Sequence, residues 1–220
     1  MTHDSSFDSP SLTTRAHHAI VEGELGRRLI HMAGTAFPAL YILPWVDWWH
    51  VALLLVLATT IAIGLETLRL LGGLELFIYE HFTREYEQDS PAAYVMYMIS
   101  MTVVAVIFDP MIAIPAILML TLADPVAGLV SGGDLRLVKR PLPMAVMFLA
   151  CAVLALPFTY ETPLAVVLGA AGGMIADGIK PQIRGFVVDD DLTIAPFAAV
   201  GLWIGNELGS FSLQVGPTVA

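Results

Sequence analysis

The sequence predicts an all-α protein, a polytopic transmembrane helix bundle of about seven spans. The 220 residues are 57% hydrophobic, with a mean hydropathy of +0.76. Only 14% are charged, against about 25% in ordinary soluble domains. Seven apolar segments follow one another, most of them close to the roughly 20 residues that cross a bilayer. Together these observations predict a multi-pass protein of the cell membrane.

The chain is predicted to form one domain between two short tails. Residues 1–22 lack a basic region followed by an apolar core, so they are not a signal peptide and are expected to be a disordered cytoplasmic tail. Residues 23–212 form the single transmembrane domain, and residues 213–220 form the second tail. The seven predicted spans are Leu29–Val46, Val51–Leu71, Ala92–Phe108, Met111–Val130, Pro143–Phe158, Pro163–Ala176 and Thr193–Phe211.

The positions of the basic residues predict which connections lie in the cytoplasm. The links Asp47–His50, Asp109–Pro110 and Thr159–Thr162 contain no Lys or Arg, so all 10 basic residues occur before the first span, in the other links or, for Arg69, at the end of the second span next to such a link. Because cytoplasmic loops carry the excess of Lys and Arg, we expect the N-terminus in the cytoplasm and the C-terminus outside. The formal net charge of −10 argues against a nucleic-acid partner, which requires a basic surface.

Asp124 is the main candidate for a functional residue. It is the single carboxylate of an apolar run, LMLTLADPVAGLVSGG, that otherwise has the character of a lipid-buried helix. Ionised side chains are costly at membrane depth and usually face a partner or a water-filled cavity. Small residues after it, including Gly128, let a ligand or a second helix approach the backbone. The alternative is a helix end that simply reaches the surface at Asp124.

Four polar residues share one face at the start of the first span. Glu24, Arg27, Arg28 and His31 are spaced i, i+3, i+4 and i+7, which places them on one helical stripe. The arginines of such a stripe can bind a phosphate, while His31 or Glu24 orients a donor or a hydroxyl group. In the alternative interpretation, the arginines extend to the membrane surface and pair with Glu24. The position of His31 inside the apolar run favours a functional role.

Further charged residues are predicted on the same side of the membrane. Glu66 and Arg69, at i and i+3, either neutralise each other or belong to the site. In the run Asp189–Asp191, one carboxylate is expected to cap the seventh helix, and the others suit Mg²⁺, which prefers hard oxygen ligands. Lys139 is either a membrane-surface anchor or a contact for a polyphosphate. The expected cation ligands are Glu66, Asp190 and Asp191, and the expected phosphate-binding residues are Arg27, Arg28, Arg69, Lys139 and Gly128.

Carboxylates and cations on one membrane face favour Mg²⁺-dependent chemistry between a phosphate-rich soluble substrate and a lipid acceptor. Five motifs, in this order, resemble those of the polyprenol (dolichol) kinase, phytol kinase and CTP-dependent phosphatidate kinase family. The motifs are ELGRRLIH, ETLR, REYE, ADPVAGLVSG and DDDLTIAP, and the resemblance extends over about Glu24 to Phe211.

The resemblance implies transfer of the γ-phosphate of CTP to the hydroxyl group of a membrane isoprenoid alcohol at the cytoplasmic face, with Mg²⁺. The residues on matching motif positions are Arg27, Arg28, His31, Glu66, Arg69, Asp124, Asp190 and Asp191. Asp124 is the first candidate for the group that accepts the hydroxyl proton, and His31 is the second. The chain departs from the family at Ala123, where glycine is usual, and at Asp177, where a glutamate is common.

Three other functions remain open at the level of sequence. A phosphatidate-type cytidylyltransferase, which makes a CDP-activated lipid, would use the same nucleotide, metal and membrane face. A transporter would place its substrate site near the middle of the membrane with access from both faces, whereas the charged residues here are predicted on one face. A purely structural scaffold is the least favoured, because buried carboxylates are costly to keep for packing alone.

Overall fold

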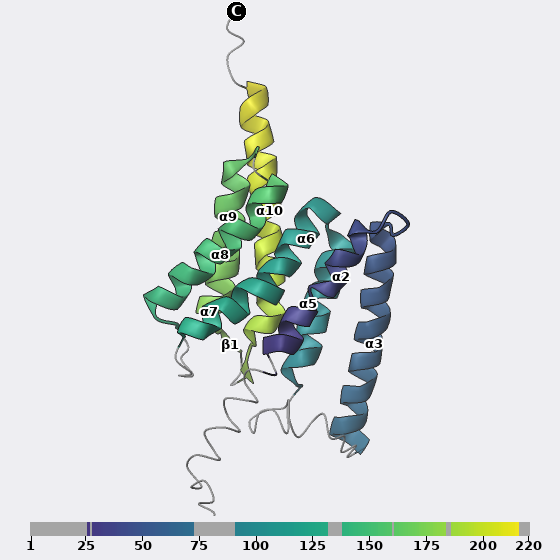
Figure 1. Ribbon diagram of the computed structural model, residues 1–220. Helices are drawn as coiled ribbons and strands as arrows, with labels where there is room; N and C mark the ends of the chain where they lie inside the picture. The colour runs from purple at the N-terminus through teal and green to yellow at the C-terminus, as the bar shows by residue number, and fades with distance from the viewer. Residues whose placement is uncertain are drawn as a thin grey trace, which may run out of the picture.

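A computed structural model describes residues 26, 28–72, 91–131, 138–159, 161–183 and 186–215. This part of the chain is almost wholly helical, so the predicted all-α class is confirmed (Figure 1). The exception is a short antiparallel pair, β1 (Gln182–Ile183) with β2 (Phe186–Val187). The predicted N-terminal tail, Glu24, Arg27 and the REYE motif lie outside the described residues. The C-terminal helix extends to Val215 and therefore includes the start of the predicted second tail.

Each of the seven predicted spans coincides largely with helical structure. Residues 28–33 are helical and are followed by α2 (Ala36–Ala39), the 3-10 helix η1 (Leu40–Ile42), α3 (Trp48–Gly72), α5 (Ala93–Ile107), α6 (Pro110–Leu118), the π-helical turn η3 (Met119–Ala123), α7 (Asp124–Val130), α8 (Pro141–Thr159), α9 (Pro163–Gly178) and α10 (Asp190–Val215). Three helical stretches in the described residues are long and apolar enough to cross a membrane: Trp48–Leu71, Pro110–Val130 and Pro141–Thr159. Helices α5 and α9 are apolar but shorter. These helices indicate a membrane protein.

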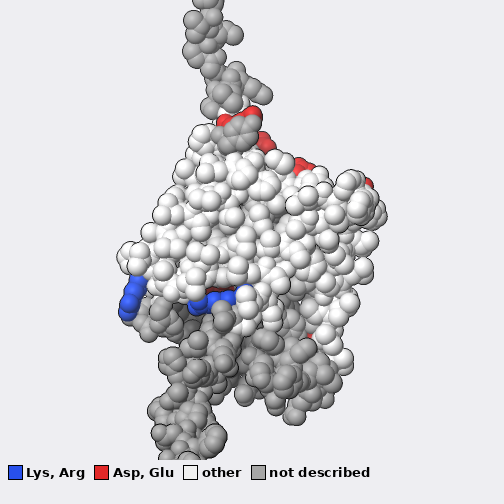
Figure 2. Space-filling model, viewed as in Figure 1, with Lys and Arg blue, Asp and Glu red and all other residues white. Residues whose placement is uncertain are grey.

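The outer surface of the bundle is apolar over a broad band. Figure 2 shows this uncharged band, with Lys and Arg at its lower margin and Asp and Glu at its upper margin on the face in view. Large apolar side chains of α3 and α8 are among the exposed ones, including Leu57 at 54% and Val153 at 64%. Apolar patches of this extent mark surfaces that contact something other than water. Hydrocarbon of a bilayer is the environment that such a band fits.

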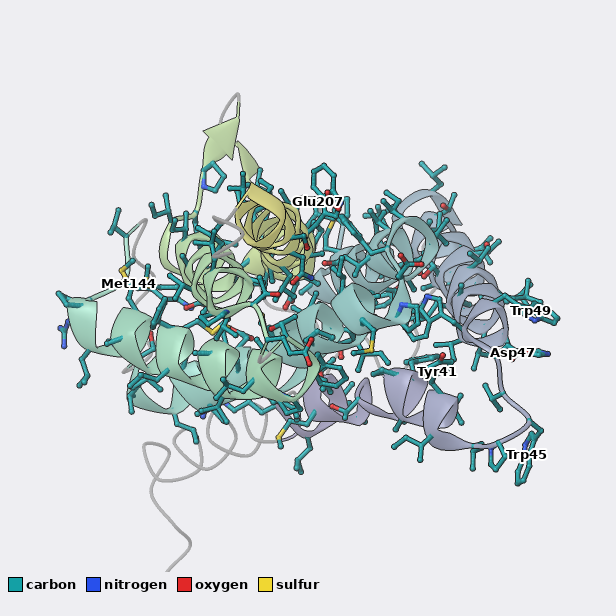
Figure 3. All side chains as sticks on the ribbon, turned by 90° about the horizontal axis from the view of Figure 1, so that it is seen from above. Tyr41, Trp45, Asp47, Trp49, Met144 and Glu207 are labelled. Carbon is teal, nitrogen blue, oxygen red and sulfur yellow. The ribbon has the colours of Figure 1, made fainter. Side chains whose placement is uncertain are left out.

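Aromatic side chains lie at the end of the bundle where α3 begins. Seen from above in Figure 3, Trp45 and Trp49 project outward near Asp47, and they are 74% and 58% exposed. Tryptophan is enriched where a membrane meets water, because its ring is largely apolar and its N–H is polar. This end of α3 therefore fits a position at the membrane surface.

The first predicted span, Leu29–Val46, is not one continuous helix. The helix at residues 28–33 ends in a turn at Gly34, whose N–H donates to His31 O at 3.1 Å. The Tyr97 hydroxyl of α5 donates to the same carbonyl at 2.6 Å. A Cβ at Gly34 would lie 1.8 Å from the Tyr97 hydroxyl oxygen, so only glycine permits this approach. The break therefore depends on a contact from another helix.

Helices α9 and α10 pack with their backbones in close contact. A Cβ at Gly172, Gly201 or Gly205 would lie 2.2–2.4 Å from a backbone atom of the facing helix. Small residues at a helix interface allow this close approach in membrane proteins. The packing fixes the end of α9 against the start of α10, and so determines the relative positions of Asp177 and Asp190.

Gly172→Ala is expected to destabilise the protein, whereas Gly64→Ala is not. At Gly172 the new Cβ would lie 2.4 Å from Phe197 O, and overpacking of this kind costs about 1–3 kcal/mol. At Gly64 nothing lies within 4 Å of the Cβ position, and alanine inside a helix is more stable than glycine by roughly 0.5–1 kcal/mol. Thermal unfolding midpoints in detergent test this pair, and equal midpoints for the two variants would contradict the packing.

Candidate functional site

Carboxylates from three helices, α7, α9 and α10, lie close together, and these three helices are neighbours in Figure 1. Asp124 is the first residue of α7, Asp177 lies near the end of α9, and Asp190 is the first residue of α10. One carboxylate oxygen from each of these residues lies within 4.8 Å of the other two. His31, Asp124 and Asp191 form a second group with the same spacing. We refer to Asp124, Asp177, Asp189, Asp190 and Asp191 as the aspartate cluster.

The π-helical turn η3 explains how His31 is attached to the cluster. In a regular α-helix the N–H of Asp124 would donate to Leu120 O, but here it donates to Met119 O. Pro125, the next residue, has no N–H and therefore cannot donate to Leu120 O either. His31 Nε2 lies 3.1 Å from Leu120 O, and because a carbonyl only accepts, Nε2 carries the proton in this contact. Such π-helical turns occur frequently at functional sites.

His31 lies between two carboxylates in a fixed orientation. Its Nε2 is 3.8 Å from Asp124 Oδ2 and 3.5 Å from Asp191 Oδ1. The edge of the ring contacts Tyr97, with ring centroids 4.3 Å apart. Because Nε2 donates to Leu120 O, the nitrogen that faces Asp124 and Asp191 does not accept a proton, and in the neutral ring only Nδ1 can do so. Of the two candidates for proton acceptor, the geometry therefore favours Asp124.

The three consecutive aspartates make different contacts. Asp189 Oδ1 accepts a hydrogen bond from Asp191 N–H at 3.1 Å, which confirms that one of the three caps the last helix. Burial and the hydrogen bond with Asp190 raise the pKa of Asp189 to about 7. Asp190 lies between two lysines, with Oδ1 3.0 Å from Lys180 Nζ and Oδ2 3.4 Å from Lys139 Nζ.

Lys139 is brought to the cluster by backbone pairing. Its N–H donates to Gly178 O at 2.9 Å, within an isolated β-bridge between the segment before α8 and the end of α9. The ammonium group then bonds to Asp177 and lies 3.4 Å from Asp190. Burial lowers the pKa of this amine, but the carboxylates of Asp190, Asp177 and Asp124 outweigh burial and raise the pKa above its usual range. Lys139 is therefore charged at neutral pH.

Asp177 is a site residue that the sequence analysis did not select. Its side chain is 0% exposed, and among the described residues its Oδ2 atom has no hydrogen-bond partner. Its other oxygen accepts from Lys139. The signal that identified Asp124, a lone carboxylate in an apolar helix, is also present in the sequence of α9, PLAVVLGAAGGMIADG.

Two of the predicted phosphate-binding residues contact each other. Arg28 Nη2 donates to Gly128 O at 3.1 Å, and a Cβ at Gly128 would lie 3.7 Å from the same nitrogen. The open backbone at Gly128 is thus covered by the guanidinium group of Arg28. This contact links the helix at residues 28–33 to α7, one turn after Asp124.

Glu66, which is predicted to bind the cation, forms a separate cluster with Arg69. Arg69 donates to both Glu66 oxygens, at 3.0 and 2.7 Å. Glu66 also accepts from Ala92 N–H at 2.8 Å and from the Tyr94 hydroxyl at 2.9 Å. Among the described residues, no group of close carboxylates and histidines includes Glu66. Glu66 therefore attaches α3 to the start of α5.

Glu66→Ala is expected to destabilise the fold strongly. Removing one partner of a buried ion pair costs about 3–5 kcal/mol, because the other partner stays buried and uncompensated. Glu207→Ala is the control, since Glu207 is exposed and surface substitutions usually change stability by less than about 0.5 kcal/mol. Thermal unfolding midpoints test this prediction. Equal midpoints for the two variants would show that Glu66 is not a structural residue.

The structure therefore divides the predicted site residues into separate groups. The members that meet are His31, Asp124, Lys139, Asp190 and Asp191, with Arg28 and Gly128 adjoining them. Carboxylate oxygens in this number suit a hard divalent cation, and lysine and arginine nearby suit phosphate. Comparisons with protein-family models, with curated proteins and with solved structures find no match.

Proposed function

We propose that this protein is a CTP-dependent kinase that phosphorylates the hydroxyl group of a membrane isoprenoid alcohol of the dolichol or polyprenol type. The observation that carries the proposal is the meeting of His31, Lys139 and the aspartate cluster at one end of an apolar bundle. At such a position a soluble triphosphate arrives from water and a lipid hydroxyl arrives from the bilayer. The choice of CTP and of an isoprenoid alcohol rests on the resemblance of the sequence motifs.

We propose seven spans, with the N-terminus and the aspartate cluster on the cytoplasmic side of the cell membrane. Figure 1 supports the proposal, because successive long helices run in alternate directions. Lys139 and Lys180 contact the cluster, and Arg28 lies beside it through Gly128. Positive residues favour the cytoplasmic side.

The carboxylates of the cluster fit Mg²⁺. Mg²⁺ takes oxygen ligands at about 2.0–2.1 Å and is usually bound by one or two carboxylates together with substrate phosphates. In the proposed site Asp190 and Asp191 hold it beside Asp124. One carboxylate oxygen from each of Asp189, Asp190 and Asp191 lies within 4.8 Å of the other two, a donor set that suits this ion. A Mg²⁺ ion held by these carboxylates would offset the negative charge of the nucleotide phosphates.

The proposed reaction moves one phosphoryl group and one proton. The lipid hydroxyl oxygen forms a bond to the γ-phosphorus, and the bond from that phosphorus to the β–γ bridging oxygen breaks, so that CDP leaves with the electron pair. Asp124, whose side chain is 21% exposed, accepts the hydroxyl proton. Lys139 and Arg28 balance phosphate charge. Catalysis of phosphoryl transfer relies mainly on such positioning and charge balance.

The test is transfer of label from γ-labelled CTP by purified protein with Mg²⁺ and a prenyl alcohol. We expect label in the lipid phase and CDP as the soluble product, and a panel of nucleoside triphosphates should show preference for CTP. Label that stays in water with every lipid alcohol would contradict the kinase. Release of pyrophosphate would indicate a cytidylyltransferase, and flux of a solute through proteoliposomes without chemistry would indicate a transporter.

A further inference from the structure

We propose that a divalent cation binds on the buried side of the aspartate cluster, between Asp124, Asp177 and Asp190, in addition to the cation proposed at Asp190 and Asp191. We call this position the inner site. The inner site is inferred from the carboxylates alone. It does not depend on which nucleotide or lipid the protein uses.

The first observation concerns the second oxygen of Asp177. The side chain is fully buried, and Oδ2 has no hydrogen-bond partner within the described residues. A buried acceptor that lacks a partner is costly, and a charged one more so. Pairing with Lys139 accounts for Oδ1 but not for Oδ2. A cation on Oδ2 supplies the partner that the described residues do not.

The second observation concerns Asp124. Its ion-pair partner in the described part of the chain is His31 Nε2, at 3.8 Å, which is longer than a hydrogen bond. The proton on that nitrogen is directed to Leu120 O, 3.1 Å away. Asp124 therefore retains oxygen lone pairs for another ligand.

The third observation is the spacing of the three carboxylates. Their ligand oxygens all lie within 4.8 Å of one another. Two oxygens bound to opposite sides of one Mg²⁺ lie about 4.2 Å apart, given bonds of about 2.1 Å. The spacing of these oxygens is therefore close to the spacing that a single Mg²⁺ ion requires.

The fourth observation is the charge balance at the inner site. Lys139 contacts Asp177 and Asp190, and Lys180 contacts Asp190. Neither lysine lies within salt-bridge distance of Asp124 among the ion pairs of the described residues. Three carboxylates therefore share two ammonium groups, and the net negative charge that remains favours the binding of a cation. Buried charges are stable when they are paired or bind a metal.

The test counts Mn²⁺ ions bound to the purified full-length protein in detergent, without nucleotide, by electron paramagnetic resonance. We expect two ions per wild-type chain and one per Asp177→Asn chain, because asparagine keeps an oxygen for Lys139 but removes the charge. Glu207→Gln removes a carboxylate from an exposed position on α10 and should bind two. One or no ion on the wild type, or two on Asp177→Asn, would overturn the inner site.

A second measurement uses the wild-type protein alone, in case Asp177→Asn does not fold. Two Mn²⁺ ions that share a carboxylate lie about 3.5–4 Å apart in two-metal sites, so pulsed measurements should detect strong coupling between them. Two uncoupled ions would contradict a shared Asp190. Two coupled ions in a protein that transfers no phosphate would support the inner site and refute the kinase. Phosphate transfer by a protein that binds a single ion would support the kinase and refute the inner site.

Discussion

Asp124→Asn is expected to reduce kcat for phosphate transfer from CTP by about 10²–10⁴-fold, the contribution of a positioned acid or base. Asparagine has nearly the same size as aspartate but cannot accept the hydroxyl proton. The nitrogen of His31 that faces Asp124 does not replace it, because Nε2 donates to Leu120 O at 3.1 Å. Initial rates with γ-labelled CTP and saturating prenyl alcohol measure the effect.

Asp47→Asn is the matched control for this prediction. It makes the same chemical change at an exposed position just before α3, beside Trp45 and Trp49 in Figure 3. We expect its kcat and its thermal unfolding midpoint to equal those of the wild type. An Asp124→Asn protein that retains wild-type kcat would show that Asp124 is not the proton acceptor. An equal loss of activity in both variants would contradict a specific role for this carboxylate.

Lys139→Met is expected to lower stability by about 3–5 kcal/mol, the cost of removing one partner of a buried ion pair. The side chain of Lys139 is 15% exposed, and its loss leaves Asp177 at 0% exposure without its cation. Neutralising that carboxylate should recover part of the loss, so the double variant with Asp177→Asn should be more stable than Lys139→Met alone. Thermal unfolding in the absence of divalent cations measures all three proteins.

The neighbouring Arg140 provides the control for Lys139. It carries the same charge and is exposed, and exposed ion pairs contribute only about 0–1 kcal/mol. Arg140→Met should therefore unfold close to the wild-type temperature. If Lys139→Met unfolds at the same temperature as Arg140→Met, the buried pair with Asp177 does not stabilise the protein.

The helices could be predicted from the sequence because a membrane imposes a local requirement. Each crossing segment must be apolar and must satisfy its own backbone hydrogen bonds, so hydropathy alone identified α3 (Trp48–Gly72) and α8 (Pro141–Thr159). The break at Gly34 could not be predicted in this way. It depends on the Tyr97 hydroxyl, 2.6 Å from His31 O, and this contact joins residues far apart in the sequence.

Candidate site residues could be predicted where the sequence itself shows a polar side chain inside an apolar run, because burial of such a side chain in a membrane is costly. Asp124 and His31 were recognised as polar groups within apolar runs, and the structure places them 3.8 Å apart. For Glu66, the sequence spacing revealed its pairing with Arg69 but not its hydrogen bond from the Ala92 N–H, 2.8 Å away just before α5. Asp177 was missed as a site residue although a lone carboxylate in the apolar α9 is visible in the sequence. Its bond to Lys139 could not be predicted, because it arises only when α9 and the segment before α8 pair.

The most direct test of the proposed reaction follows two labels of one CTP molecule, one on the γ-phosphate and one on the cytosine. Purified wild-type protein with Mg²⁺ and a prenyl alcohol should move only the phosphate label into the lipid phase and leave the cytosine label in water as CDP. Cytosine label in the lipid phase, with the phosphate label released as pyrophosphate, would contradict the kinase account, and so would the absence of both labels from the lipid phase.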